Sequence, residues 1–175
     1  MSTDPRLAIR FCPLCGSREF VLKVPRQDDK ERLACGRCDY VHYVGPLLAA
    51  GVILHDGHRV LLVKRALEPG KGKWTFPGGF VDLDEPPEQA ALREAQEETG
   101  LAPTLERLLG IYNSIGPKGK RVVIAVYVAR AEGSARIGND EVLDLRWYEP
   151  DQLPVHDYAF PSTATALRDW HAAHS

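Results

Sequence analysis

The feature that most constrains this chain is a set of glutamates with helical spacing, in the segment between positions 79 and 101. Glu94, Glu97 and Glu98 stand three and four positions apart, which brings their side chains to one face of a helix. Like charges at this spacing destabilise an isolated helix by roughly 0.2–0.5 kcal/mol per pair. Because clustered carboxylates suit a hard divalent cation, the spacing predicts a helix that binds Mg²⁺ or Mn²⁺.

The residues around these glutamates predict a loop, a helix and a second loop. Pro86 and Pro87 are tolerated in the first turn of a helix, and Asp84 or Glu85 is expected to cap its free N–H groups. Gly100 is expected to end the helix. The expected apolar stripe beside the acids consists of Ala91, Leu92, Ala95 and Thr99.

An ordinary solvated helix face is the alternative interpretation, since Arg93 could neutralise Glu97 one turn away. The complete segment favours function instead. It reads GFVDLDEPPEQAALREAQEETGL from Gly79 to Leu101. This resembles the signature of the Nudix hydrolases (glycine, five residues, glutamate, seven residues, Arg-Glu, apolar, any, Glu-Glu, any, glycine, apolar), with no position missing.

The resemblance implies an α/β fold, a Nudix α/β/α sandwich with a mixed sheet. It also implies a metal-dependent pyrophosphatase that cleaves the P–O–P bridge of a nucleoside diphosphate linked to another group. By position, Glu94, Glu97, Glu98 and the carbonyl of Gly78 would be the ligands of the catalytic Mg²⁺ or Mn²⁺.

Roles in catalysis and in bracing also follow from the resemblance. Family members use either a glutamate of the signature or an acid on a later loop as general base. The catalytic candidates are therefore Glu97, Glu98 and Glu141, although Glu141 could equally be a surface residue beside Asp140. The residues expected to brace the loop and helix are Gly79, Glu85 and Arg93.

The four cysteines of the chain form a second pattern. Cys12 and Cys15 make one CxxC pair, and Cys35 and Cys38 make another after 19 residues. This spacing predicts a structural zinc ion held by four thiolates. Disulfides and a redox pair are the alternatives. Disulfides are disfavoured because the first ten residues lack the apolar core of a secretory signal, and redox chemistry needs only one pair.

Length and composition fit a small zinc ribbon at 1–44 and a Nudix hydrolase domain at 45–175. No apolar run is long enough to span a membrane, and a net charge of −2 gives no reason to expect nucleic acid as a partner. We therefore expect a small-molecule substrate and a cytoplasmic location. A homodimer is possible.

From position 47 onwards the pattern predicts an α/β domain. Strands 47–54 and 59–65 form a hairpin around a glycine turn. The other expected strands are 74–76, 80–81, 105–112, 122–128 and 144–148. A helix is expected at 161–174, with Ala166, Leu167, Trp170 and Ala173 buried.

The substrate is the least determined feature of the sequence. The ribbon, the segment KRALEPGKGKWTFPGGF and the tail DQLPVHDYAFPSTATAL resemble a subgroup associated with ADP-ribose and FAD pyrophosphatase activity. NADH pyrophosphatases usually carry an SQPWPFP-type array that is missing here, whereas Pro117 lies close to where ADP-ribose hydrolases often have proline. NADH, dinucleoside polyphosphates, oxidised nucleoside triphosphates and a non-catalytic nucleotide sensor remain alternatives. Candidate substrate contacts are Arg65, Lys73, Trp74 and Phe160.

Overall fold

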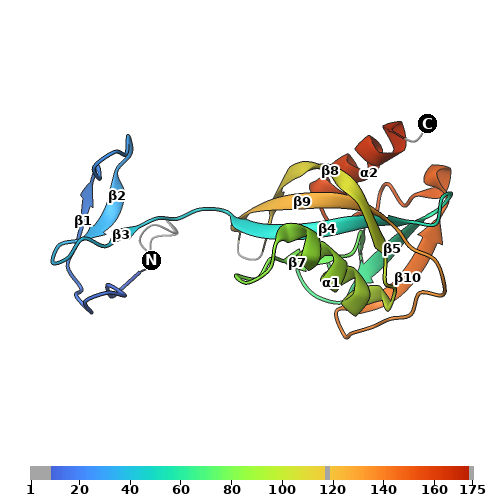
Figure 1. Cartoon of the computed structure of the whole chain (residues 1–175), viewed down its shortest axis with the longest axis horizontal. Coiled ribbons are helices and arrows are strands. Elements are labelled where there is room, and N and C mark those ends of the chain that lie inside the picture. The colour runs from blue at the N-terminus through green and yellow to red at the C-terminus, as the bar shows by residue number, and fades with distance from the viewer. Residues whose placement is uncertain (1–8, 117–118, 174–175) are drawn as a thin grey trace. The chain divides into compact units, whose positions relative to one another are not determined.

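The computed structural model describes residues 9–116 and 119–173. They form two compact units that divide between Gly45 and Pro46 (Figure 1). Pro117 and the last position of the expected helix, His174, lie outside the described residues. No helix in the described part of the chain is both long and apolar enough to cross a membrane.

The N-terminal unit is a three-stranded antiparallel sheet with the order β1-β2-β3. Its strands are β1 (Phe20–Lys23), β2 (Arg32–Cys35) and β3 (Val41–His42). Each cysteine pair lies in a tight turn. The N–H of Gly16 donates to the carbonyl of Cys12 (2.8 Å), and the N–H of Cys35 donates to the carbonyl of Tyr40 (2.8 Å). Gly16 has φ +72°, a value that glycine adopts without strain.

The larger unit is built on a seven-stranded mixed sheet. Along the main path the strand order is β10-β5-β4-β9-β8, while β6 pairs with β5 and β7 with β4. The strands are β4 (Leu47–His55), β5 (Val60–Arg65), β6 (Trp74–Thr75), β7 (Gly78–Phe80), β8 (Thr104–Ile115), β9 (Arg121–Arg130) and β10 (Val142–Tyr148). The helices are α1 (Pro87–Thr99), α2 (Pro161–Ala172) and the short 3₁₀ helix η3 (Pro150–Gln152).

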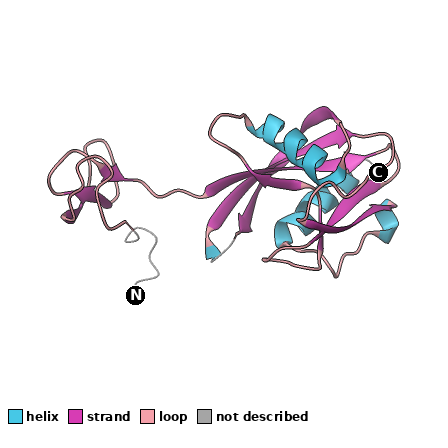
Figure 2. Ribbon diagram, turned by 90° about the horizontal axis from the view of Figure 1, so that it is seen from below, coloured by secondary structure: helices cyan, strands magenta, loops and turns pink. Residues whose placement is uncertain are grey.

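The two long helices pack on opposite faces of the central strand β4 (Figures 1 and 2). Val52 and Leu54 belong to the hydrophobic cluster that includes Ala95 of α1. Ile53, between them, belongs to the cluster that includes Leu167 of α2. This alternation follows from the two-residue period of a strand, and it confirms the expected α/β/α sandwich with a mixed sheet.

Several local expectations were wrong. The strands expected at 105–112 and 122–128 are present as β8 and β9, but each begins one residue earlier and ends two or three residues later, because their backbone pairing continues from Thr104 to Ile115. The strand expected at 80–81 is β7 at Gly78–Phe80, where it pairs with β4. Ala173 is exposed because the helix ends at Ala172.

The cap expected for α1 is also absent. Pro86 occupies the N-cap position and no side chain caps the helix, so neither Asp84 nor Glu85 fulfils that role. The carboxylate of Glu85 instead accepts hydrogen bonds from the N–H of Asp82 (3.0 Å) and from Arg93 (2.7 Å). The Glu85 carboxylate is thus engaged by Arg93 and by the N–H of Asp82, and Pro86 at the N-cap position has no side-chain acceptor to offer.

Candidate functional site

Glycines bring the short strand β7 against β4 on one side and against α1 on the other. Gly78 pairs with Gly51 of β4, and a Cβ atom at Gly78 would lie 2.5 Å from the carbonyl oxygen of Ala50. A Cβ atom at Gly79 would collide with the carboxylate of Glu94. The backbone of β7 can therefore lie directly beside the acidic face of α1.

Arg93 is the centre of the polar contacts around α1. Its Nη2 donates to Glu85 (2.7 Å) and to the carbonyl of Phe80 (3.2 Å), while its Nε also donates to Glu85 (3.0 Å). Its Nη1 donates to Glu94 (2.8 Å) and Glu97 (3.2 Å). The guanidinium thus joins the loop before the helix to the helix itself through charge-assisted hydrogen bonds.

Glu98 is the most buried acid of the site, with 4% of its surface exposed. Its Oε2 accepts a hydrogen bond from the N–H of Gly78 (3.2 Å). Burial raises the pKa of Glu98 to about 8, and the negative charges of Glu94 and Glu141 add to this effect. Burial likewise raises the pKa of Glu94, with further contributions from Glu97 and Glu141. These carboxylates are close enough to repel one another.

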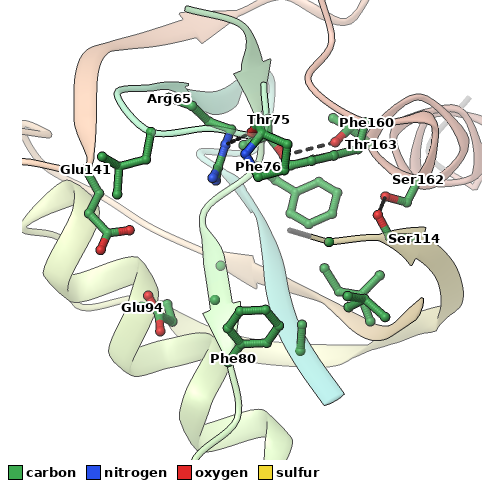
Figure 3. A pocket seen from close by; sticks show the side chains of 18 of the residues that line it. Arg65, Thr75, Phe76, Phe80, Glu94, Ser114, Glu141, Phe160, Ser162 and Thr163 are labelled. Atoms are coloured by element: carbon green, nitrogen blue, oxygen red, sulfur yellow. Dashed lines mark hydrogen bonds between the residues drawn. The ribbon is translucent and has the colours of Figure 1, made fainter. Parts of the chain in front are cut away.

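A cavity of about 470 Å³ opens beside these acids. Its charged wall includes Glu94, Glu97, Glu141, Arg65 and Arg93. The lining residues contributed by β8, β9 and the start of α2 carry no charge; they are Ser114, Ile115, Gly116, Val122, Ile124, Phe160, Ser162 and Thr163. Figure 3 shows Glu94 and Glu141 facing each other, with Ser114 and Ser162 on the other side of the pocket.

Hydroxyl groups hold the uncharged wall together. The Oγ1 atoms of Thr75 and Thr163 are 2.9 Å apart, and Ser162 donates to Ser114 over 3.2 Å (Figure 3). Thr75, Ser162 and Thr163 are all buried. Thr75, Ser162 and Thr163 lie within the two segments that resemble the ADP-ribose and FAD subgroup, but that resemblance assigned them no role, and Ser114 lies outside both segments. The tertiary packing of α2 against the sheet brings the four residues together, so their contacts could not be predicted from the sequence.

The structure separates the four expected substrate contacts into two pairs. Arg65 and Phe160 line the cavity, and the guanidinium of Arg65 lies 5.2 Å from the centre of the Phe160 ring. Lys73 is exposed and is not a lining residue. Trp74 is 5% exposed and packs in the core against Tyr148, with ring centres 5.4 Å apart. Lys73 and Trp74 are therefore not placed to contact a ligand in the cavity.

The four cysteines converge in the N-terminal unit. Their sulfur atoms all lie within 4.8 Å of one another. Cys12 and Cys38 are 3.5 Å apart, and Cys15 and Cys35 are 3.6 Å apart. A tetrahedral zinc site with Zn–S bonds of about 2.3 Å separates its sulfurs by about 3.8 Å, so the cluster has the size of such a site. The main-chain N–H of Arg37 lowers the pKa of Cys35 to about 7, whereas burial and the neighbouring cysteines raise the pKa of Cys38.

The glutamates fit a divalent cation less directly. Among the described residues, the cysteines are the one group of three or more potential ligands that converges within 4.8 Å. Arg93 lies between Glu94 and Glu97 and holds both. The donor set is nevertheless suitable, because hard carboxylate oxygens gather beside the backbone of β7, where Gly79 leaves room for them.

Comparisons with known proteins agree with this architecture. A family model described as NUDIX domain matches residues 45–170, and a zinc-ribbon model described as Nudix N-terminal matches residues 10–44. The crystal structure of a NUDIX hydrolase from Nitrosomonas europaea superimposes with a TM-score of 0.79 and 30% sequence identity. The match covers 94% of this chain and 93% of that one.

Two curated relatives have more specific names. The ADP-ribose pyrophosphatase of Methanocaldococcus jannaschii is 35% identical over 117 residues, which cover 66% of this chain and 69% of that protein. The NAD-capped RNA hydrolase NudC of Haemophilus influenzae is 31% identical over 164 residues, which cover 91% of this chain. The chain spans 57% of the length of that NudC protein.

Proposed function

The chain belongs to the Nudix hydrolase family, and from this premise we propose that it hydrolyses the pyrophosphate bridge of a nucleoside diphosphate derivative. The proposed substrates are ADP-ribose and FAD, both of which would release AMP. The observation that carries the proposal is the crowding of four carboxylates beside one cavity, those of Glu94, Glu97, Glu98 and Glu141. Arg93 offsets their negative charge only in part, because it also binds Glu85.

The residues proposed to hold the catalytic Mg²⁺ or Mn²⁺ are Glu94, Glu97, Glu98 and the carbonyl of Gly78. Buried, mutually repelling carboxylates are costly without a compensating charge, and a cation would supply it. When bound, the cation would neutralise charge that develops on the phosphate oxygens during hydrolysis. For the ribbon we propose a structural zinc ion held by Cys12, Cys15, Cys35 and Cys38. These cysteines form no disulfide, which would suit a reducing, cytoplasmic location.

The two walls of the cavity suit the two halves of such a substrate. Arg65 is proposed to bind the diphosphate, because the guanidinium of Arg93 is already engaged by Glu85, Glu94 and Glu97. The uncharged wall, with its hydroxyl groups, would accept a nucleoside through hydrogen bonds and apolar contacts. Phe160, beneath Arg65, is proposed to contact the substrate alongside it.

Glu141 is proposed as the residue that activates water. Its side chain is exposed on the cavity wall and faces Glu94 (Figure 3). The water oxygen would form a bond to one phosphorus, the bond from that phosphorus to the bridging oxygen would break, and the proton would pass to the Glu141 carboxylate. Glu98 is too buried to reach the water as freely, and Glu97 is held by Arg93.

The M. jannaschii relative, named an ADP-ribose pyrophosphatase, supports ADP-ribose as substrate. The match to NudC, a protein named as an NAD-capped RNA hydrolase, covers 91% of this chain and makes NADH the second candidate. A hydrolysis screen with Mg²⁺ or Mn²⁺ separates these possibilities. It would compare ADP-ribose, FAD, NADH, a dinucleoside polyphosphate and an oxidised nucleoside triphosphate.

The second product distinguishes the substrates, because AMP is common to several of them. We expect ribose 5-phosphate from ADP-ribose or FMN from FAD. Reduced nicotinamide mononucleotide from NADH as the preferred reaction would contradict the proposed substrate but not the chemistry. Tight binding of ADP-ribose with no metal-dependent cleavage of any compound would contradict the enzyme and favour a nucleotide sensor.

Arg65→Gln is expected to raise KM for ADP-ribose by about ten- to a hundredfold. It removes a charge-assisted contact to phosphate, which is worth about 1.5–3 kcal/mol. Steady-state kinetics would measure the change. Lys73→Gln is the matched control, since it removes the same charge from an exposed residue off the cavity wall and should leave KM unchanged. An equal effect of both substitutions would contradict a specific role for Arg65.

A further inference from the structure

We propose that Gly138 is a positioning residue for the catalytic carboxylate of Glu141. In this view Gly138 lets the loop formed by residues 131–141 dock on the carboxyl end of α1, and this docking fixes Glu141 on the cavity wall opposite Glu94. The inference rests on the role proposed above for Glu141.

The loop supplies hydrogen-bond donors to the end of α1. The last carbonyls of a helix have no partner within the helix and must find one elsewhere. The N–H of Arg136 donates to the carbonyl of Thr99 (2.9 Å), and that of Gly138 donates to the carbonyl of Glu98 (3.2 Å). The loop is thus bonded to the same helical turn that carries the acids of the site.

Only a residue without a side chain can approach this closely at position 138. A Cβ atom there would collide with the main-chain carbonyl oxygen of Glu97. That oxygen belongs to the helix backbone and cannot rotate away as the end of a flexible side chain could. The φ of Gly138 does not lie in the left-handed region, so the requirement is for space and not for an unusual conformation.

A short segment connects this docking point to Glu141. The N–H of Glu141 donates to Oδ1 of Asn139 (3.1 Å), and the carbonyl of Glu141 accepts from the N–H of Ala66 (2.7 Å). The next residue, Val142, pairs with Arg65 in the sheet. Glu141 is therefore held between an anchor on α1 and an anchor on β5, and its side chain faces Glu94 (Figure 3).

An alanine at position 138 should displace the loop and leave the helix in place. The end of α1 is packed firmly, since Thr99 is fully buried and Leu101 is 5% exposed. Ile137 and Gly138, by contrast, are exposed. The added methyl group would push the loop outwards, and Glu141 would move with it.

Gly138→Ala is expected to lower kcat/KM by about ten- to a hundredfold, because displacement of a catalytic group by about 1 Å can cost that much. The assay would use the preferred compound of the hydrolysis screen with Mg²⁺, and circular dichroism would show an unchanged Tm within about 2 °C. Ser134→Ala, an exposed substitution in the same loop, is the control and should keep wild-type kinetics.

A double-mutant cycle with Glu141→Gln tests whether Gly138 acts through Glu141. If it does, Gly138→Ala/Glu141→Gln should be no less active than Glu141→Gln alone. If the double variant instead loses activity by the product of the two single effects, the proposal is overturned, and displacement of Glu97 or Glu98 would explain the loss. Full activity of Glu141→Gln or of Gly138→Ala would overturn it as well. A wild-type protein that cleaves nothing in the screen would instead refute the proposed function on which the inference rests.

Discussion

Replacement of Glu98 by glutamine is expected to lower kcat by roughly 10³-fold or more, because it would remove a proposed cation ligand whose charge would help to stabilise the transition state. The shape of the site should survive. The amide oxygen of glutamine can still accept the hydrogen bond from the N–H of Gly78, which the carboxylate accepts over 3.2 Å. Steady-state kinetics at saturating Mg²⁺ would measure the loss.

The same substitution should change how stability depends on pH. In the protein without a divalent cation, burial raises the pKa of Glu98 from its ordinary value of 4.5 to about 8. The folded state then binds this proton more tightly than the unfolded state, so stability falls as the pH rises through this range. Glutamine cannot ionise. In EDTA at pH 8 or above, Glu98→Gln should therefore melt at a higher temperature than the wild-type protein.

Glu88→Gln is the matched control on the same helix. Glu88 is exposed, does not line the cavity and contacts the hydroxyl of Tyr127 (3.3 Å), so its substitution should change neither kcat nor the pH dependence of stability. Retained activity in Glu98→Gln would contradict the assignment of Glu98 as a metal ligand. A large loss in Glu88→Gln would show that any loss of charge from α1 is harmful.

Local patterns predicted the sandwich well because they report directly on backbone and burial. The apolar runs at 47–54 and 59–65 on either side of a glycine turn predicted two strands, and β4 and β5 lie there with most of their residues buried. Helical spacing placed Glu94 and Glu98 on one face of α1. Gly100 ends that helix with φ +69°, as its residue type predicts.

Pairings across distant segments were not predictable in the same way. Glu85 is a residue type that often caps a helix, but its carboxylate forms an ion pair with Arg93 instead. Trp74 has the chemistry of a ring that stacks on a ligand, but β6 turns it into the core. The contact between Ser114 and Ser162 spans 48 positions. Such contacts depend on how α2 packs against the sheet, and a short stretch of sequence carries no information about this packing.

Cys35→Ser is expected to remove about one equivalent of zinc per chain and to unfold the N-terminal unit. A serine hydroxyl is a poor ligand for zinc beside three thiolates, and binding of a structural zinc ion contributes about 10–16 kcal/mol in comparable small domains. Elemental analysis would measure the metal. Limited proteolysis would detect new cleavage within residues 9–45.

Arg37→Ala is the control that distinguishes loss of a zinc ligand from a general disturbance of the turn between Cys35 and Cys38. It changes an exposed side chain but keeps the main-chain N–H that donates to the sulfur of Cys35 over 3.4 Å, so zinc content and protease resistance should be unchanged. Both hydrophobic clusters of the larger unit consist of residues from 46–175. Calorimetry of Cys35→Ser should therefore retain the main unfolding transition, and unaltered zinc content in that variant would refute the four-thiolate site.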